Sequence, residues 1–473
     1  MTPQDTLSHR IAAFVYQTAF NTIPQYAIAT TRRHLLDAIG CCLAAADVDT
    51  SRALAAWLRD EGGTQQASAI GLATRLPAAQ AAFLNGALAR SLEYDDMAMP
   101  DLHPSGVIAP VTLAVAEWQE TSGEALLAAL ALGLELCLRI GRAGYDAGGR
   151  SSRFLKRGQD ASAICGAVAG AAVAARLLGL GPEGIRDAIG IAISLASGSL
   201  EANRSGGTIK RLQSGWAAKS AIQAACLARA GISGPTEAFE GSYGFYACFI
   251  DGTFDAAMLA HDLGARWELG TMRFKPYPSN YYTYAGIDAA LALVRDGLQP
   301  DQIDTAELVV AAPMLRTIGE PLDRKQTPQT AYEAKFSGPY TVAAALLGGG
   351  GLGLGIDDFT DALVRDPVRR ALMQRITVVA DPECDAVFPD QAPAILTVRT
   401  VSGERKIARV MVNRGGPDRP LDDKELASKF ADNAGRALSA QDAGRLLDAI
   451  AALPDIPVAH ITSLFRLART AFP

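Results

Sequence analysis

Residues 161–180 have the sequence ASAICGAVAGAAVAARLLGL, which is the most membrane-like stretch of the chain. It consists mostly of alanine and glycine, with few large apolar side chains and with one charged residue, Arg176. A membrane-spanning helix depends on large aliphatic residues for its insertion. A helix that is apolar on all sides otherwise lies at the centre of a large bundle, where small residues let backbones approach closely. The stretch therefore predicts a buried bundle helix and no membrane span.

Helical periodicity extends on both sides of this stretch, from the start of the chain to about residue 270. Apolar residues between Leu35 and Leu43 keep the i, i+1, i+4, i+8 spacing of an amphipathic helix. Charged and polar residues interrupt the apolar positions at the N-terminus, which is unlike a secretory signal. Further helices are predicted at residues 76–92, 106–120, 123–142, 161–179, 183–200 and 214–230.

The pattern changes near Arg273, where valine-rich segments alternate apolar and polar residues. Such alternation predicts β-strands, which we place at residues 305–312, 375–380, 395–400 and 406–412. The last two strands flank Val401-Ser402-Gly403-Glu404, a segment suited to a hairpin connection. Helices are predicted at residues 341–347 and, after Pro420, at 422–438 and 440–452.

The glycine run at residues 348–353 is the one segment that resembles a phosphate-binding loop. It follows a predicted helix instead of a strand, and no Lys-Ser or Lys-Thr pair comes after it. Both features are required of a phosphate loop, so the run predicts a flexible loop.

Together these patterns predict a mainly α protein with two domains. A large all-helical domain is formed by both chain ends, at residues 1–271 and 416–473. A smaller α+β lid domain is inserted between them at residues 272–415.

The composition limits the possible partners. The chain has 473 residues, is 49% hydrophobic and carries a formal net charge of −6. No global basic field therefore attracts nucleic acid or an anionic membrane, and an anionic substrate needs a local cationic pocket. The seven cysteines are odd in number and form no C-x-x-C pair, which favours buried thiols in a reducing cytoplasm. The spacing of cysteines and histidines predicts no metal site.

Four stretches, in order along the chain, resemble motifs of the MmgE/PrpD family. They are Asn85-Gly86-Ala87 with Glu93-Tyr94-Asp95-Asp96 and His103-Pro104-Ser105-Gly106; Gly207-Thr208-Ile209-Lys210 with Ala217-Ala218-Lys219; Lys275-Pro276-Tyr277-Pro278-Ser279; and Ala334-Lys335-Phe336-Ser337-Gly338-Pro339-Tyr340 with Arg414-Gly415-Gly416-Pro417.

Members of this family include 2-methylcitrate dehydratases, cis-aconitate decarboxylases and an iminodisuccinate epimerase. The resemblance implies a helical domain with an α+β lid, a homodimer, and a pocket between bundle and lid. It also implies a small carboxylate substrate and no metal or organic cofactor.

The residues at the family positions suit proton abstraction beside a carboxylate. That reaction forms an unstable dianion and needs a base, an acid and a cationic clamp. His103 is one of five histidines and precedes a proline, which keeps it out of a helix. We expect His103, Lys210 and Asp95 to be catalytic. Asp95 and Asp96 form either an acid–base pair or a support for the histidine loop, and we favour the structural role for one of them.

The same resemblance implies a set of residues that bind the substrate. The set comprises Glu93, Asp96, Met97, Thr208, Arg273, Lys275, Tyr277, Asn280 and Tyr284.

Several of these residues depart from the family pattern. Glu93 replaces an aspartate, and Met97 replaces a hydroxyl residue of the decarboxylase-like members. Asn280 and Tyr284 stand where those members carry histidines, and Asp160 takes the place of another family histidine. These changes remove proton carriers. The resemblance to the family therefore supports the fold of this chain more strongly than its reaction.

The leading functional hypothesis is a cofactor-free hydro-lyase that resembles 2-methylcitrate dehydratase. An isomerase or epimerase of a dicarboxylate would use the same intermediate. A decarboxylase of a cis-aconitate-like acid is a third hypothesis, and a binding protein that keeps the fold but has lost catalysis is a fourth.

Overall fold

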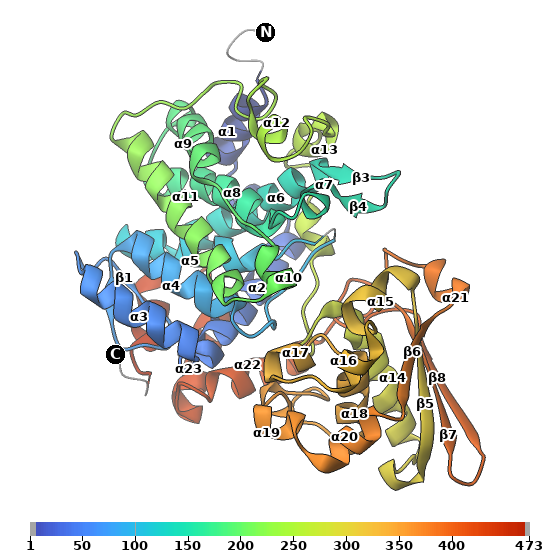
Figure 1. Cartoon of the computed structure of the whole chain (residues 1–473). Coiled ribbons are helices and arrows are strands. Elements are labelled where there is room, and N and C mark those ends of the chain that lie inside the picture. Colours follow the sequence, from blue (N-terminus) through green and yellow to red (C-terminus); the bar gives the residue numbers. More distant parts are fainter. Residues whose placement is uncertain (1–5, 100, 469–473) are drawn as a thin grey trace. The chain divides into compact units, whose positions relative to one another are not determined.

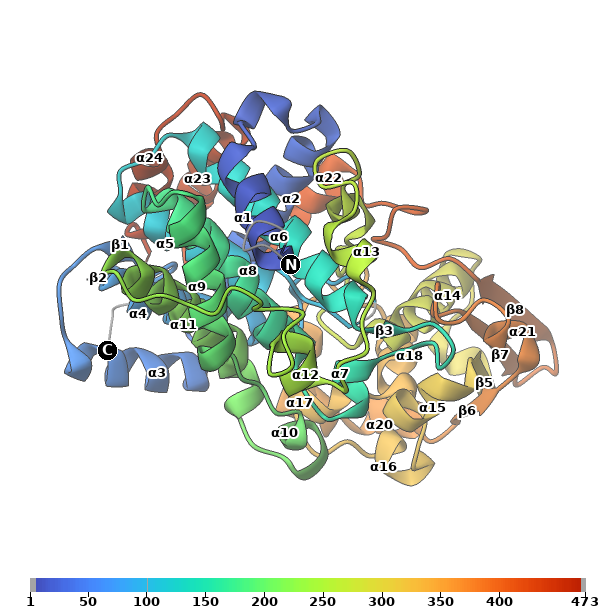
Figure 2. The ribbon, with the colours of Figure 1, turned by 90° about the horizontal axis from the view of Figure 1, so that it is seen from above.

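The structure is a computed structural model that describes residues 6–99 and 101–468. Residues 1–5, where the N-terminal stretch begins, lie outside this description. The chain forms two compact units (Figures 1 and 2). The first comprises residues 1–91, 95–272 and 430–473, and the second comprises residues 92–94 and 273–429. The domain boundaries expected after residues 271 and 415 stay a prediction.

The first unit is built almost wholly of helices, most of them coloured from blue to green in Figure 1, with the C-terminal helices in red. Its longer helices are α1 (Leu7–Gln17), α2 (Gln25–Ala45), α3 (Asp49–Glu61), α4 (Ala78–Arg90), α5 (Ser105–Trp118), α6 (Gly123–Ala143), α8 (Ala161–Leu177), α9 (Pro182–Leu195), α11 (Gln213–Arg229), α23 (Ala440–Ala451) and α24 (Val458–Phe465). Its shorter helices and strands are α7 (Arg153–Lys156), α10 (Glu201–Ser205), α12 (Phe245–Phe249), α13 (Ala256–Ala260), the pair β1 (Ala67–Ser68) and β2 (Arg75–Leu76), and the pair β3 (Tyr145–Asp146) and β4 (Ser151–Ser152).

Helix α8 lies at the centre of the first unit. It packs against α5, α6, α9 and α11, and all its residues from Ala161 to Ala175 are buried. A side chain at Gly170 would meet Ala221 on α11, and one at Gly166 would meet Val107 on α5. The small residues of α8 thus permit these close approaches, and the predicted buried bundle helix is confirmed.

The second unit combines one sheet with helices. The strand order is β6 (Ile376–Ala380), β5 (Ile303–Val310), β7 (Ala394–Thr400) and β8 (Arg405–Val410). Strands β5 and β6 are parallel, whereas β5 pairs antiparallel with β7, and β7 with β8. Helices α14 (Tyr284–Arg295) and α18 (Gly338–Leu347) contact this sheet (Figure 1). The other helices are α15 (Ala312–Ile318), α16 (Leu322–Gln326), α17 (Ala331–Ala334), α19 (Asp361–Val364), α20 (Pro367–Met373) and α21 (Pro382–Asp385).

Helix α22 (Asp423–Ala434) belongs to both units, because the second unit ends at Lys429 and the first resumes at Phe430.

The mainly α class and the predicted elements are confirmed, with several local differences. The helix expected at 183–200 ends at Leu195, and the helix expected at 422–438 ends at Ala434. Helix α2 is amphipathic only in its first half, since every residue from His34 to Ala45 is buried. Strand β7 is buried nearly throughout instead of alternating.

The glycine run after α18 is a loop, as predicted, with left-handed φ at Gly348, Gly351 and Gly353. Within residues 6–99 and 101–468, no helix combines the length and the hydropathy that a membrane crossing requires.

Helices α4 and α11 provide a test of close packing. A Cβ atom at Gly86 would lie 2.7 Å from the Gly215 Cα atom. We predict that Gly86→Ala lowers the free energy of unfolding by about 1–3 kcal/mol, because backbone atoms of α11 would have to move. Urea unfolding measures this.

Gly444→Ala is the matched control, because a Cβ atom there meets nothing within 4 Å. Alanine favours a helix over glycine by up to about 1 kcal/mol, so this variant should be as stable as the parent or more so. Equal stability of the two variants would contradict the packing argument.

Candidate functional site

The candidate site of the first unit is built on the loop between α4 and α5. His103 lies just before Pro104, which caps α5, and is outside the helix as predicted. The His103 N–H donates to the Ser162 hydroxyl at 3.0 Å. Ser162 belongs to the buried start of α8, so the loop is fastened to the central helix of the unit.

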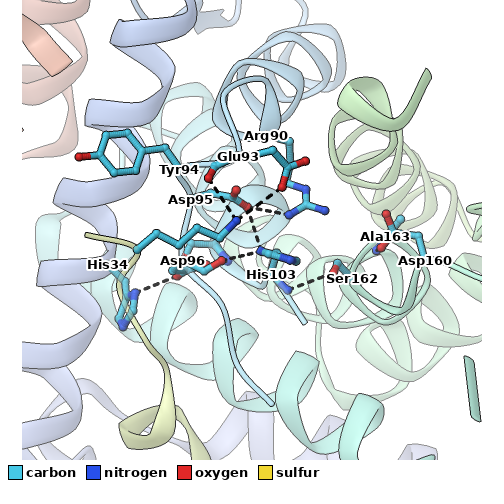
Figure 3. Close-up of polar contacts among 12 residues, drawn as sticks. His34, Arg90, Glu93, Tyr94, Asp95, Asp96, His103, Asp160, Ser162 and Ala163 are labelled. Atoms are coloured by element: carbon cyan, nitrogen blue, oxygen red, sulfur yellow. Dashed lines mark hydrogen bonds and ion pairs between the residues drawn. The ribbon is translucent and has the colours of Figure 1, made fainter. Parts of the chain in front are cut away.

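The hydrogen bonding of His103 fixes its tautomer. The ring atom Nδ1 lies 2.7 Å from the Asp96 carbonyl oxygen (Figure 3). A carbonyl oxygen can only accept, so Nδ1 carries the hydrogen. In the neutral ring Nε2 is then the atom that can accept a proton. The side chain is 14% exposed.

The Asp95 carboxylate forms a buried ion pair with the last residue of α4. Its Oδ2 lies 3.1 Å from Nη1 of Arg90, and both side chains are buried. The same oxygen lies 3.4 Å from Nδ1 of His103. Asp95 is therefore placed between a permanent cation and the imidazole.

The Asp96 carboxylate faces different partners. Its Oδ2 lies 2.8 Å from Nδ1 of His34 on α2, and it is also in contact with the Ser105 hydroxyl. Its Oδ1 accepts the Ser105 N–H at 3.3 Å. Asp95 and Asp96 lie in a loop and not on a helix, yet their side chains diverge. Of the two, this arrangement favours the structural role for Asp96.

Several charged groups of this region influence the pKa of the Asp101 carboxyl. The pKa of its carboxyl is raised, chiefly because the surrounding protein replaces water, although the residue as a whole is exposed by area. The charge of His103 opposes this rise most, Arg90 and Lys210 oppose it further, and Asp160 adds to it. Lys210 is half-buried in a 3₁₀ turn at Ile209–Leu212. His103 and Lys210 thus act on one carboxyl group.

Three further residues named from the sequence lie in the first unit: Asp160, Met97 and Thr208. Asp160 caps α8 by accepting the Ala163 N–H at 3.2 Å, while its buried Oδ2 has no hydrogen-bond partner among the described residues. Met97 is buried, and Thr208 is exposed just before the turn that holds Lys210.

Glu93 and Lys275 lie together in the second unit. Nζ of Lys275 lies 3.6 Å from Oε2 of Glu93 and donates to its carbonyl oxygen at 3.3 Å. The Tyr332 hydroxyl donates to Oε1 of Glu93 at 3.2 Å. Glu93 has a left-handed φ of 56°. Residues 92–94 therefore pack with the second unit, although the residues before and after them belong to the first.

The remaining candidates of the second unit form hydrogen bonds within it. Tyr277 donates to Asp288 at 2.5 Å, and burial raises the pKa of its hydroxyl. Tyr284 donates to the carbonyl oxygens of Tyr277 and Ser279. The Asn280 side chain accepts the Tyr282 N–H. A separate contact joins Arg273 to the Tyr281 hydroxyl at 3.0 Å.

The residues that hold the loop were not predicted from the sequence. They are His34, Arg90, Ser105 and Ser162. Ser105 was visible within the His-Pro-Ser-Gly motif, but no spacing links His34 of α2 to the loop. In the part of the chain that the structure describes, no group of three or more His, Cys, Asp or Glu residues could hold a metal ion. Metal independence itself stays a prediction.

Comparison with known proteins assigns the family. The MmgE/PrpD N-terminal domain matches residues 9–257, and the MmgE/PrpD C-terminal domain matches residues 277–455. The chain belongs to the MmgE/PrpD family.

Its relatives include enzymes of two named activities. A cis-aconitate decarboxylase-like protein of Aspergillus oryzae, oryM, is 27% identical over 96% of this chain and 95% of its own. Human cis-aconitate decarboxylase is 29% identical over 81% of this chain and 78% of its own. The 2-methylcitrate dehydratase of Cupriavidus necator is 27% identical over 80% of this chain and 78% of its own.

The Arg90–Asp95 pair predicts a large effect on stability. Arg90→Leu would remove the guanidinium group beside a buried carboxylate. Breaking a buried ion pair in this way typically costs about 3–5 kcal/mol. We expect a loss of that order in urea unfolding.

Arg52→Leu is the control, because Arg52 pairs with Asp47 and Asp49 on an exposed surface. An exposed pair contributes about 0–1 kcal/mol. If the two variants lost equal stability, the Arg90–Asp95 pair would not be a buried constraint of the site.

Proposed function

We propose that this protein is a hydro-lyase that removes water from a small carboxylic acid, beginning with proton abstraction beside a carboxylate. The observation that carries this proposal is the tautomer of His103. Because Nδ1–H donates to the Asp96 carbonyl, Nε2 is left as a base in a largely buried setting.

The proposed reaction has two bond-breaking events. Nε2 of His103 accepts the proton from the carbon next to the carboxylate, and the electron pair moves toward the carboxylate oxygens. Lys210 would stabilise the resulting negative charge. The C–O bond to the hydroxyl group then breaks, a double bond forms, and an acid protonates the departing hydroxide to give water.

Decarboxylation of a cis-aconitate-like acid is the second candidate. It is supported by the relative that matches 96% of this chain, which is named as decarboxylase-like. Two departures weigh against it. Asn280 and Tyr284 stand where such members carry histidines, and here both bond to backbone groups. An epimerase would share the first intermediate with the hydro-lyase, and a binding protein would show no turnover at all.

The homodimer, the cytoplasmic location, the absence of metal and cofactor, and the wider set of substrate-binding residues belong to this proposal as well. The cytoplasmic location rests on the odd number and the spacing of the cysteines, and the absence of a metal rests partly on the spacing of cysteines and histidines. The other points rest on the resemblance to the family.

Incubation of the purified protein with 2-methylcitrate and with cis-aconitate in deuterated water tests the reaction. We expect water loss from 2-methylcitrate, seen by proton NMR and mass spectrometry as an unsaturated product. Release of carbon dioxide from cis-aconitate would favour the decarboxylase. Solvent deuterium in unchanged acid would favour an epimerase, and inertness toward a panel of carboxylic acids would favour the binding protein.

His103→Ala and Lys210→Ala should each lower turnover. Loss of a positioned general acid or base costs about 10²–10⁴-fold in rate. Thermal unfolding should change little, because His103 and Lys210 are only partly buried. His261→Ala serves as the control, since this histidine is 70% exposed. Full activity of His103→Ala would show that the proposed mechanism is wrong.

A further inference from the structure

His34 is a buried histidine to which the proposed mechanism gives no role. It lies on α2, in a stretch where every residue up to Ala45 is buried. Its side chain has no solvent exposure. A substrate therefore cannot reach its ring, and a direct part in proton transfer to substrate is excluded by burial.

A continuous series of contacts leads from His34 to His103 (Figure 3). Nδ1 of His34 lies 2.8 Å from Oδ2 of Asp96. Ser105 holds the same carboxylate through its hydroxyl and its N–H. The carbonyl oxygen of Asp96 then accepts Nδ1–H of His103 at 2.7 Å. One residue thus meets His34 with its side chain and His103 with its main chain.

The contacts in this series constrain the structure because the carboxylate of Asp96 is buried. A carboxylate removed from water must be compensated by a cation or by hydrogen-bond donors. Ser105 supplies two donors to Asp96. Nδ1 of His34 lies 2.8 Å from the same carboxylate, at the distance of an ion pair although without the geometry of a hydrogen bond. Both contacts restrict the side chain of Asp96. Because the residue is restricted, the direction of its carbonyl group is restricted as well. That carbonyl decides which nitrogen of His103 carries the hydrogen.

We propose that His34 is a positioning residue, which through Asp96 holds His103 in the tautomer that leaves Nε2 as the base. The inference rests on the proposed function of His103. It assigns to the His34–Asp96 pair a task beyond stability, namely the orientation of the imidazole.

Other ionisable groups around the two histidines must be kept constant in a test. Asp95 lies 3.4 Å from the His103 ring and pairs with Arg90. The charge of His103 acts on Asp101. The negative charge of Asp96 contributes to a raised pKa of Cys137 on α6, after burial. Lys210 and Asp160 also act on Asp101. We therefore change only His34.

Three substitutions separate the position of the polar nitrogen from the presence of a side chain. His34→Asn places an amide nitrogen near the position of Nδ1, His34→Gln reaches toward the position of Nε2, and His34→Leu has no polar nitrogen. The protein is labelled with ¹⁵N-histidine, and the His103 signals are assigned by their loss in His103→Ala. The ring nitrogen shifts of the protein without substrate report the tautomer directly.

We expect the parent protein and His34→Asn to show His103 with hydrogen on Nδ1. His34→Leu and His34→Gln should show a mixture of tautomers. With the acid that is turned over, kcat should fall by about 10–100-fold, as for residues that orient metal-bound histidines. KM should change less, the acid limb of the pH profile should move, and His34→Asn should restore most of kcat. If His34→Leu does not fold, as circular dichroism would reveal, His34→Gln and His34→Asn decide the matter.

His261→Asn is the matched control, because His261 also contacts an aspartate, Asp262, at 2.8 Å, but on an exposed surface. It should leave the His103 signals unchanged. Unchanged His103 signals in both His34→Leu and His34→Gln would overturn the inference, and so would equal effects of His34→Asn and His34→Gln. Because the NMR measurement needs no substrate, it stands even if none of the tested acids is turned over, and failure of the proposed function is then seen separately.

Discussion

Carboxylates buried within an apolar bundle must find cations or donors inside it, and the first unit depends on this constraint. Asp95 and Asp96 are almost fully removed from water, and an unpartnered buried charge costs several kcal/mol. Arg90 on α4 meets the first carboxylate, and His34 on α2 meets the second. The loop that carries His103 is thereby tied to two helices. The orientation of the His103 imidazole therefore follows from the partners that the bundle provides for Asp95 and Asp96.

The departures from the family pattern can be understood in the same physical terms. Asn280 accepts a backbone N–H at the start of a 3₁₀ turn, and Tyr284 donates to two backbone carbonyl oxygens. Buried backbone groups need such partners. Each side chain thus supports the fold of the second unit at a position where decarboxylase-like members have a histidine. Family membership consequently constrains the architecture of this chain more firmly than its reaction.

Much of the fold could be predicted because periodicity and composition are local properties. The alanine- and glycine-rich stretch at residues 161–180 predicted a buried helix, and α8 lies at the centre of its unit. The hairpin around Gly403 was predicted from its flanking strands and joins β7 to β8. The prediction of a regular alternation in β7 was wrong, because burial depends on what packs over each face of a strand. No local pattern contains that information.

The sequence by itself determined the mainly α class, the two types of unit and the presence of His103 before a proline, because each follows from neighbouring residues. Only the tertiary structure decided that Asp96 meets His34 while Asp95 meets Arg90. Adjacent carboxylates look alike in a sequence. They become different when helices that are distant along the chain dock against them, since each buried charge then takes the partner that the packing brings within reach.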